Sequence, residues 1–451
     1  MSDSMVQTMY GQKLVSADEA VKIIKSGDLV YMGEFMQFPE ALEGALAKRV
    51  NELTDVSLRV TTVSRPCKCI EADPRREHFI LEDWHFGGVS RGLHPKGLSS
   101  YLPFTYHQCP RIVDLYQKTD VAMVPVTTMD ANGYFNFSTS NSIAGANCRN
   151  ASKVIVEVNT SNPVCLGGNT EHIHISEVDY VVEGPNTPLP QLPETTPSET
   201  DKKISAVVME LIQDGSCLQL GIGGLPNTIG AMIAASDLKD LGVHTEMLAD
   251  SYVDMYLAGR ITGKRKTLDK GKMVYTFAMG TQKLYSFLDG NTTCASYPVD
   301  YTNDPSIICQ NDRVVAINNA LEVDLFSQAA SEAAGPRQIS GTGGQLDFIL
   351  GAFKSLEGKG LLCISSTYKD KNGQAKSRIV PTLSPGTIVT CPRSLIHYVV
   401  TEFGAVQLKG KSTWQRAEAL ISIAHPDFQD ELIQQAKGEL NIWKRSNKIP
   451  M

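Results

Sequence analysis

The feature that most constrains the fold of this chain is a strand–turn–helix unit that occurs twice. Residues 218–247, "LQLGIGGLPNTIGAMIAASDLKDLGVHTEM", begin as an apolar strand, turn through a glycine-rich loop, enter a helix near Pro226 and return to a second strand that ends at Glu246. Residues 31–42, "YMGEFMQFPEAL", show the same order of strand, glycine, apolar turn, proline and helix. We interpret the two units as the starts of two related halves, with a chance resemblance as the alternative.

Strands and helices alternate along both halves of the chain. Short β-rich runs such as "VAMVPV", "KVIVEV", "RVVAINN" and "GTIVTC" are separated by helical or turn segments. This alternation favours parallel or mixed sheets that are covered by helices. Because 451 residues are also too many for one ordinary core, we predict an α/β protein with more than one domain.

A proline-rich segment separates the halves. Residues 183–203 contain five prolines together with threonines and acidic residues, a composition that disfavours helices and strands. We therefore divide the chain into an N-terminal domain at 1–182, a linker at 183–203 and a C-terminal domain at 204–451.

Composition narrows the classes of partner. The 42 Lys and Arg residues against 49 Asp and Glu residues give a net charge of −7, which argues against general nucleic-acid binding. No apolar run reaches the roughly 18 residues of a membrane helix, and the first residues have no signal-peptide core, so we expect a cytoplasmic protein. Of the ten cysteines only Cys67 and Cys69 are close together, so we interpret them as isolated thiols rather than as disulfides or a zinc site.

Three familiar catalytic patterns fit poorly. The run "GAVQLKGKST" (404–413) ends in Gly-Lys-Ser, but five residues separate its glycines where a P-loop has four, so ATP hydrolysis there is disfavoured. His172 and His174 share one face of an expected strand but lack a third metal ligand, and a half-exposed strand is the better interpretation. The serine-hydrolase pattern G-x-S-x-G is absent.

Two glycine-rich loops and one carboxylate are left as candidate chemistry. The loop after Leu220 has a proline where a dinucleotide fold needs its third glycine, which disfavours a nucleotide site and leaves bare backbone N–H groups. The loop at Ser340–Gly344 could present N–H groups to an oxyanion or a pyrophosphate, or be only a tight turn. Glu246 could be a salt-bridged surface residue or, at the end of a strand in an open sheet, a nucleophile.

Several longer motifs, taken in order, resemble those of one family. The runs "GIGGLPN", "LGVHTEM", "PVDYTNDP", "NNALEVDL", "SGTGGQLDF" and "STWQRAEALISIAHPDF" resemble the acetyl-CoA hydrolase/transferase family of class I CoA-transferases. Within this family they look most like the butyryl-CoA:acetate and 4-hydroxybutyrate CoA-transferases. The resemblance extends from about Leu14 to Asn447. It implies an α/β fold of two topologically related open domains, with the active site at their interface.

The resemblance also assigns residues to the reaction. It implies that Glu246 is the catalytic nucleophile and that the backbone N–H groups of Leu225 and Gly344 stabilise the oxyanions. A family lysine that binds CoA matches Lys359 best, with Lys354 as the alternative. The residues implied to bind CoA are Gly221, Ile222, Gly223, Gly224, Leu225, Ser340, Gly344 and Lys359.

Two further residue sets have open roles. Glu322 lies in the family motif "EVDL" but does not match the position of the nucleophile, so we interpret it as structural. The apolar turn with Phe35, Met36 and Phe38, together with Gly133–Phe137, is predicted to line the acyl pocket, with core packing as an equal alternative.

The implied activity is transfer of CoA between a short-chain acyl-CoA, such as butyryl-CoA or 4-hydroxybutyryl-CoA, and a carboxylate such as acetate. A glutamyl-CoA thioester on the enzyme would link two half-reactions, so ping-pong kinetics are expected. An acyl-CoA thioesterase is the first alternative, and a non-catalytic acyl-CoA-binding protein is the second. CoA is a substrate and no metal or other cofactor is implied. We expect small-molecule partners, no nucleic acid, no membrane and a homo-oligomer.

Overall fold

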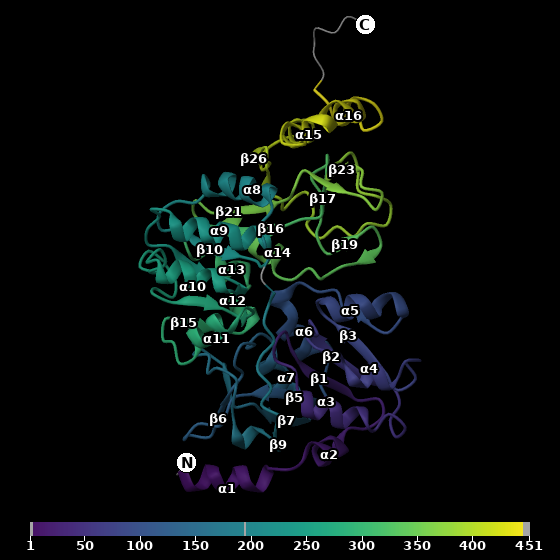
Figure 1. Cartoon of the computed structure of the whole chain (residues 1–451), viewed down its shortest axis with the longest axis vertical. Coiled ribbons are helices and arrows are strands. Elements are labelled where there is room, and N and C mark those ends of the chain that lie inside the picture. Colours follow the sequence, from purple (N-terminus) through teal and green to yellow (C-terminus); the bar gives the residue numbers. More distant parts are fainter. Residues whose placement is uncertain (1–2, 194, 445–451) are drawn as a thin grey trace, which may run out of the picture. The chain divides into compact units, whose positions relative to one another are not determined.

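The computed structural model describes residues 3–193 and 195–444, and the chain divides into two compact units (Figure 1). The first unit comprises residues 1–193, 244–253 and 272–304, and the second comprises 194–243, 254–271 and 305–451. The units therefore differ from the single division predicted from the sequence. Two short segments from the second half of the chain belong to the first unit, and one of them carries Glu246.

A parallel sheet is the frame of the first unit. Its seven strands, in spatial order, are β4 (Ser100–Tyr101), β3 (Phe79–Asp83), β2 (Val56–Thr61), β1 (Leu29–Glu34), β5 (Val121–Val126), β7 (Lys153–Val158) and β9 (Tyr180–Glu183). All six neighbouring pairs run parallel. Because β1 lies at the centre, between β2 and β5, the sheet extends in opposite directions from it, and the carboxyl end of such a strand is where ligands usually bind.

Helix α3 (Glu40–Ala47) shows how the first sheet is covered. Pro39 precedes its first turn, where a missing N–H costs nothing, and Glu40 and Glu43 lie near the helix N-terminus. Leu42 and Leu46, four residues apart on one face, are fully buried in the same apolar cluster as β1. This packing holds the turn between β1 and α3 in place.

The remaining elements that lie wholly in the first unit are short. They are α1 (Asp3–Lys13), α2 (Ala17–Ala20), η1 (Val21–Ile23), α4 (Lys68–Ala72), α5 (Gly88–Leu93), η2 (His94–Lys96), η3 (Tyr106–Gln108), α6 (Cys109–Tyr116), β6 (Tyr134–Asn136), α7 (Ala144–Asn150), β8 (His172–His174), η4 (Ile175–Glu177), β12 (Met247–Leu248), β13 (Met273–Tyr275), β14 (Phe277–Ala278), α11 (Gln282–Leu288), β15 (Cys294–Ser296) and α12 (Val299–Thr302).

The second sheet has eight strands in the order β15-β13-β11-β10-β16-β21-β25-β26. Strand β10 (Cys217–Leu220) lies between β11 (Gly242–His244) and β16 (Val314–Asn319) and is parallel to both. Parallel strands β21 (Lys359–Cys363) and β25 (Tyr398–Thr401) follow, and β26 (Gly404–Gln407) closes this edge antiparallel to β25.

Helices and small hairpins complete the second unit. They are α8 (Glu199–Met209), α9 (Gly224–Ala235), α13 (Pro305–Ile308), β17 (Glu322–Asp324), β18 (Ala329–Ala330), β19 (Ala333–Ala334), β20 (Arg337–Gln338), α14 (Gln345–Lys354), β22 (Thr367–Lys369), β23 (Ala375–Ser377), β24 (Ile379–Val380), α15 (Thr413–Ser422) and α16 (Pro426–Lys437), while α10 (Asp250–Leu257) begins in the first unit and ends in the second. Helices α8 and α9 pack against each other, and α8 also contacts β25 and β26 (Figure 1).

The two sheets share one topology. Around β1 the order is β4-β3-β2-β1-β5-β7-β9, and around β10 it is β15-β13-β11-β10-β16-β21-β25. In both sheets the first strand in the sequence lies at the centre, the next ones extend to one side, and the later ones extend to the other side. The predicted α/β fold of two topologically related open domains is confirmed, and with it the repeat read from the segments at 31–42 and 218–247.

The predicted linker needs one correction. The described residues 184–193 and 195–198 contain no helix or strand, as expected, but α8 begins at Glu199, inside the predicted linker. Ser198 is the N-cap residue and forms a reciprocal capping box with Asp201. The acids and hydroxyls that suggested an irregular segment therefore act as helix-start signals.

Candidate active site

Glu246 lies in the short break between two strands. It follows β11 and precedes β12, and it is half-buried. Its carbonyl oxygen accepts hydrogen bonds from the backbone N–H groups of Thr276 at 3.0 Å and Phe277 at 3.2 Å. The backbone of the candidate nucleophile is thus fixed by another segment of the same unit.

Asn303 donates a hydrogen bond to the Glu246 carboxylate. The distance from Asn303 Nδ2 to Glu246 Oε2 is 2.7 Å, and Asn303 is fully buried at the end of α12. His244 Nε2 donates to the carbonyl oxygen of Thr302 at 2.8 Å, so a residue two positions before Glu246 also fixes the residue before Asn303. A hydrogen bond to an ionised acceptor is stronger than one between neutral groups, and this one sets the direction of the carboxylate.

Asn303 has no role in the expectations drawn from the sequence, although it lies inside the run "PVDYTNDP". The two residues are 57 positions apart. A contact over that separation has no local periodicity or spacing, so only the folded chain shows it.

A second carboxyl group lies in a buried polar cluster of the same unit. Glu34, the last residue of β1, is 2% exposed, and its Oε1 accepts hydrogen bonds from the Tyr31 hydroxyl at 2.6 Å and the Ile143 backbone N–H at 3.1 Å. The hydroxyls of Ser142 and Tyr106 lie 2.5 Å apart. These four side chains, of Tyr31, Glu34, Tyr106 and Ser142, are called the Glu34 cluster below.

Burial dominates the electrostatics of the Glu34 cluster. It raises the pKa of Glu34 to about 7, against the donors of Tyr31 and Ile143 and the nearby Ser142 hydroxyl, which lower it. Burial also raises the pKa of Tyr106, and the negative charges of Glu34 and Glu246 raise it further. Both carboxyl groups therefore act on the same hydroxyl.

Aromatic packing joins the turn after β1 to the segment that holds Glu246. The rings of Phe35 and Phe277 stack with centroids 3.6 Å apart. Phe277 N–H is one of the two donors to the Glu246 carbonyl oxygen. Phe35, expected to line an acyl pocket, is thus a packing residue here.

The other expected acyl-pocket residues line two different cavities of the first unit. Met36 and Phe38 line a small hollow with Gln37 and other polar residues, whereas Tyr134 and Phe137 line a separate cavity of about 390 Å³. Neither of these two cavities is lined by both segments, so an acyl pocket formed by the two together stays a prediction. The sequence shows which residues are apolar, but it does not show which cavity their side chains face.

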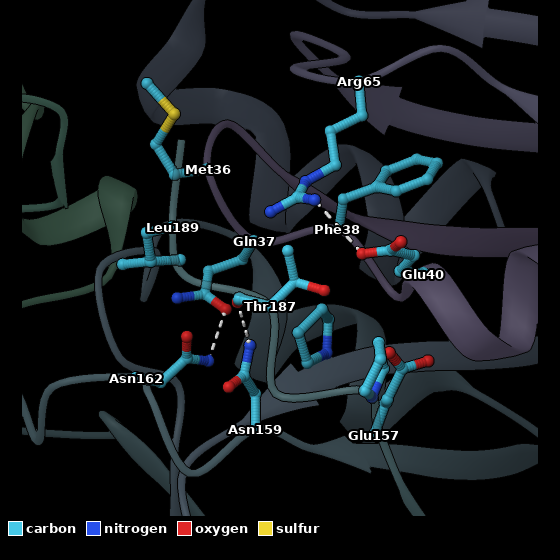
Figure 2. A pocket seen from close by; sticks show the side chains of 12 residues that line it. Met36, Gln37, Phe38, Glu40, Arg65, Glu157, Asn159, Asn162, Thr187 and Leu189 are labelled. Atoms are coloured by element: carbon cyan, nitrogen blue, oxygen red, sulfur yellow. Dashed lines mark hydrogen bonds and ion pairs between the residues drawn. The ribbon is translucent and has the colours of Figure 1, made fainter. Parts of the chain in front are cut away.

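Figure 2 shows that the small hollow is largely closed by its own side chains. Asn162 Nδ2 donates to Gln37 Oε1 at 2.9 Å, Asn159 Nδ2 donates to the Thr187 carbonyl oxygen at 2.8 Å, and Arg65 pairs with Glu40 at 3.1 Å. The free volume is about 20 Å³, which is room for one water molecule rather than for an acyl chain.

The first glycine-rich loop is in the second unit, directly after β10. Gly223 has φ +111°, a conformation that side chains disfavour, and α9 begins at Gly224 without a side-chain cap. Leu225 and Pro226 are buried in the first turn, whereas Ile222 is 37% exposed. An uncapped first turn has backbone N–H groups with no helical partner, and such groups can donate to an acceptor.

The second loop has the same kind of end. Gly344 is the N-cap residue of α14, again without a side-chain cap, and Gly343 has φ +52°. The loop is anchored at its start, because the Ser340 N–H donates to the Glu332 carbonyl oxygen at 3.0 Å and the Thr342 hydroxyl donates to the Glu332 carboxylate at 2.7 Å.

The elements next to the two loops contact the same strand, β16. Asn318, in β16, donates to Gln219 of β10 at 3.0 Å, and Gln345 of α14 donates to the carbonyl oxygen of Asn319 at 2.6 Å. The carboxyl end of β16 is thus flanked by the strand that leads into the first loop and by the helix that follows the second.

The two candidate lysines and the rejected glutamate also lie in the second unit. Lys359 is half-buried, its Nζ donates to the Leu211 carbonyl oxygen at 3.1 Å, and burial lowers its pKa. Lys354 ends α14 and is exposed. Glu322 lies in β17, where burial raises its pKa and the charge of Arg378 lowers it.

His172 and His174 lie on β8, as expected, beside the Tyr134 ring. The described residues contain no group of three or more His, Cys, Asp or Glu side chains arranged around a common metal position. Among residues 3–193 and 195–444, no helix has the length and apolar composition needed to cross a bilayer.

Comparisons with known proteins agree over almost the whole chain. The "Acetyl-CoA hydrolase/transferase N-terminal domain" family matches residues 1–193, and the corresponding "C-terminal domain" family matches 280–436. The chain is 49% identical to the butyryl-CoA:acetate CoA-transferase of Anaerostipes caccae, over 97% of this chain and 99% of that protein. It is 38% identical to the 4-hydroxybutyrate coenzyme A transferase of Clostridium kluyveri, over 96% and 99%. The crystal structure of RipA from Yersinia pestis superimposes with a TM-score of 0.87 at 37% identity, over 97% and 99%.

Proposed function

The chain belongs to the acetyl-CoA hydrolase/transferase family, and on this premise we propose that it is a CoA-transferase that moves CoA between a short-chain acyl-CoA and a carboxylate such as acetate. The resemblance found in the motifs is confirmed by both matched domains. Butyryl-CoA and 4-hydroxybutyryl-CoA are the first donors to test, because relatives named for these acyl groups are similar over nearly their whole length.

One observation carries the proposal: a half-buried carboxylate, Glu246, is aimed by a buried amide donor, Asn303, at 2.7 Å. Of the alternatives left open for Glu246, a salt-bridged surface residue does not need such a donor. A nucleophile does, since one carboxylate oxygen is held while the other attacks.

The chemistry runs in two balanced halves. A Glu246 oxygen attacks the thioester carbonyl, the C–S bond breaks, and CoA leaves as a thiolate, so that a mixed anhydride joins Glu246 to the acyl group. The thiolate attacks the Glu246 carbonyl, which releases the first acid as a carboxylate and leaves a glutamyl-CoA thioester. The acceptor carboxylate then reverses both steps and leaves as its CoA ester.

The second unit supplies the donors in this proposal. The N–H groups of Leu225 and Gly344 stabilise the tetrahedral oxyanions, for which one preorganised donor typically contributes about 3–4 kcal/mol. The loops at Gly221–Leu225 and Ser340–Gly344 hold CoA, and Lys359 meets its phosphates. CoA is a substrate, no further cofactor takes part, and a cytoplasmic homo-oligomer stays a prediction.

Labelling of the enzyme tests the proposal. The protein is incubated with butyryl-CoA without an acceptor acid, reduced with borohydride and digested, and the modified peptide is mapped by mass spectrometry. We expect modification at Glu246, with release of butyrate that stops after about one equivalent per site, while the CoA thiol stays on the enzyme as the glutamyl thioester. Modification at Glu322, or turnover without any adduct, would contradict it. Continuous thiol release without acceptor would assign the protein as a thioesterase instead.

A further inference from the structure

The side chain of Glu34 is buried with one oxygen occupied and the other not. Oε1 accepts two hydrogen bonds, from Tyr31 and Ile143, while Oε2 is inaccessible to solvent and has no hydrogen-bond partner among the described residues. An ionised carboxylate with an orphan oxygen in this setting is costly, because nothing replaces the water it has lost.

The groups that face Glu34 do not supply a positive charge. They are the hydroxyls of Tyr31, Ser142 and Tyr106 and the Ile143 amide, and the negative charge of Glu246 also acts on Tyr106. Cys148, of α7, acts on Tyr31 and is itself held as a neutral thiol, since burial raises its pKa to about 12. With Oε1 accepting two donors, a proton on the carboxyl group belongs on Oε2.

The backbone that holds Glu34 also holds the reacting pair. The Ser142 N–H donates to the Thr276 carbonyl oxygen at 3.1 Å, and the Thr276 N–H donates to the Glu246 carbonyl oxygen at 3.0 Å. On its other side the Ser142 carbonyl oxygen accepts from the Val299 N–H at 3.0 Å, and Val299 begins the single-turn helix that ends at Asn303. Ser142 therefore connects both the nucleophile segment and the amide-donor segment to the Glu34 cluster.

We propose that Glu34 is a positioning residue that works as a neutral acid, and that its ionisation sets the alkaline limit of the reaction. As a neutral acid it holds residues 140–143 against Thr276 and Val299, which keeps Glu246 aligned with Asn303. As a carboxylate it adds a second negative charge that acts on Tyr106, in a region where the reaction already develops negative charge. This inference rests on the proposed CoA transfer through Glu246.

The sign of the pH dependence follows from the chemistry. The pKa of Glu34 is raised to about 7, so the neutral acid predominates below that pH and the carboxylate above it. If only the neutral form supports transfer, kcat/KM falls by about tenfold for each pH unit above the pKa.

The test compares pH profiles of the wild type, Glu34→Gln and a matched control, Glu157→Gln. Glu157, in β7 of the same sheet, is 4% exposed and has a pKa raised to about 7, but its carboxylate accepts from the Ala41 and Leu42 amides at the start of α3. Both variants replace a buried carboxyl group with a neutral amide of the same shape, and folding is checked by thermal unfolding.

We expect wild type and Glu157→Gln to lose activity above pH 7, and Glu34→Gln to stay within about threefold of its pH 6 value up to pH 9. An unchanged alkaline fall of activity in a folded Glu34→Gln enzyme, or a flat wild-type pH profile, overturns the inference.

Borohydride labelling is run in parallel. Absence of an adduct at Glu246 in the wild type defeats the proposed function, whereas a Glu246 adduct with an unchanged alkaline fall defeats only the role of Glu34. If Glu34→Gln does not fold, the pH profile of the wild type decides the question. A flat profile overturns the inference. An alkaline fall of activity with an apparent pKa near 7, found also in Glu157→Gln, supports it.

Discussion

Two strand-to-helix turns occupy equivalent places in the two sheets and have opposite characters. The turn after β1 is closed: Glu34, Phe35, Met36 and Gln37 are each at most 5% exposed. Glu34 and Gln37 exchange backbone hydrogen bonds at 2.8 and 2.9 Å. The turn after β10 is open: Ile222 is 37% exposed, and the helix that follows has no side-chain cap.

The glycines in the two turns show the same contrast. Gly33 has φ +74°, and a Cβ there would lie 2.3 Å from the Gln37 carbonyl oxygen, so the fold itself requires a glycine. Gly223 has φ +111°, yet a Cβ there would meet nothing within 4 Å. One supersecondary unit thus forms a packed turn in one sheet and, in the other, a more exposed turn for which we propose the role of N–H donor.

Removal of Glu246 is expected to have the largest effect on activity, because all the other groups are proposed to act on this residue. We expect Glu246→Ala to lose about four orders of magnitude or more in kcat, as removal of a catalytic nucleophile does in other enzymes. Glu322→Ala, a partly buried glutamate of the second unit, is the control and should keep most of the activity. The assay is CoA transfer from butyryl-CoA to acetate, with circular dichroism to check folding. Equal losses in both variants would contradict the assignment.

Asn303 tests the first unit, which contains both the closed turn after β1 and Glu246. Asn303→Ala removes the 2.7 Å hydrogen bond that helps to set the direction of the Glu246 carboxylate. We expect kcat to fall by about 100- to 1,000-fold, the range seen when one preorganised donor is removed. KM for the acyl-CoA should change little, since Asn303 is proposed to position the nucleophile and not to bind CoA. A large rise in KM with unchanged kcat would argue against that role.

Gly223→Ala tests the open turn after β10. Because Gly223 has φ +111°, alanine there is strained and turns the neighbouring N–H groups away, and such strain costs of order 1–3 kcal/mol. We expect KM for the acyl-CoA to rise by about tenfold. Gly373→Ala is the matched control, because Gly373 also has a positive φ, of +79°, with open space around it, but lies in the β22–β23 hairpin. If both variants raise KM equally, the effect is strain alone.

The open turn could be predicted from the sequence and the closed one only in part. A strand, several glycines, a proline and a helix are local signals, so the segment at 218–247 indicated both the fold and a loop of bare N–H groups. The same signals at 31–42 indicated the repeat. They did not show that Glu34, in an apolar turn, binds Tyr31 and Ile143, because the Glu34–Ile143 partnership spans 109 positions. Asn303 escaped prediction for the same reason.

The smallest expected effect concerns the choice between Lys359 and Lys354 as the residue that meets the CoA phosphates. Lys359 Nζ is 3.1 Å from the Leu211 carbonyl oxygen, so its ammonium group is held in place by one of its three donors. The other donors are free to face a phosphate without a large loss of side-chain entropy. Lys354 is exposed, and contacts of such a residue contribute little.

We therefore expect Lys359→Ala to raise KM for butyryl-CoA about fivefold at low salt, with a smaller effect at high salt, and Lys354→Ala to change it less than about twofold. Butyryl-pantetheine, which has the same thioester but lacks the nucleotide phosphates, distinguishes a binding role of Lys359 from a structural one. If Lys359 meets a phosphate, the Lys359→Ala penalty disappears with this substrate, because the lost contact does not exist in either enzyme. A penalty of equal size with both substrates means that Lys359 supports the start of β21 through Leu211 and does not bind CoA.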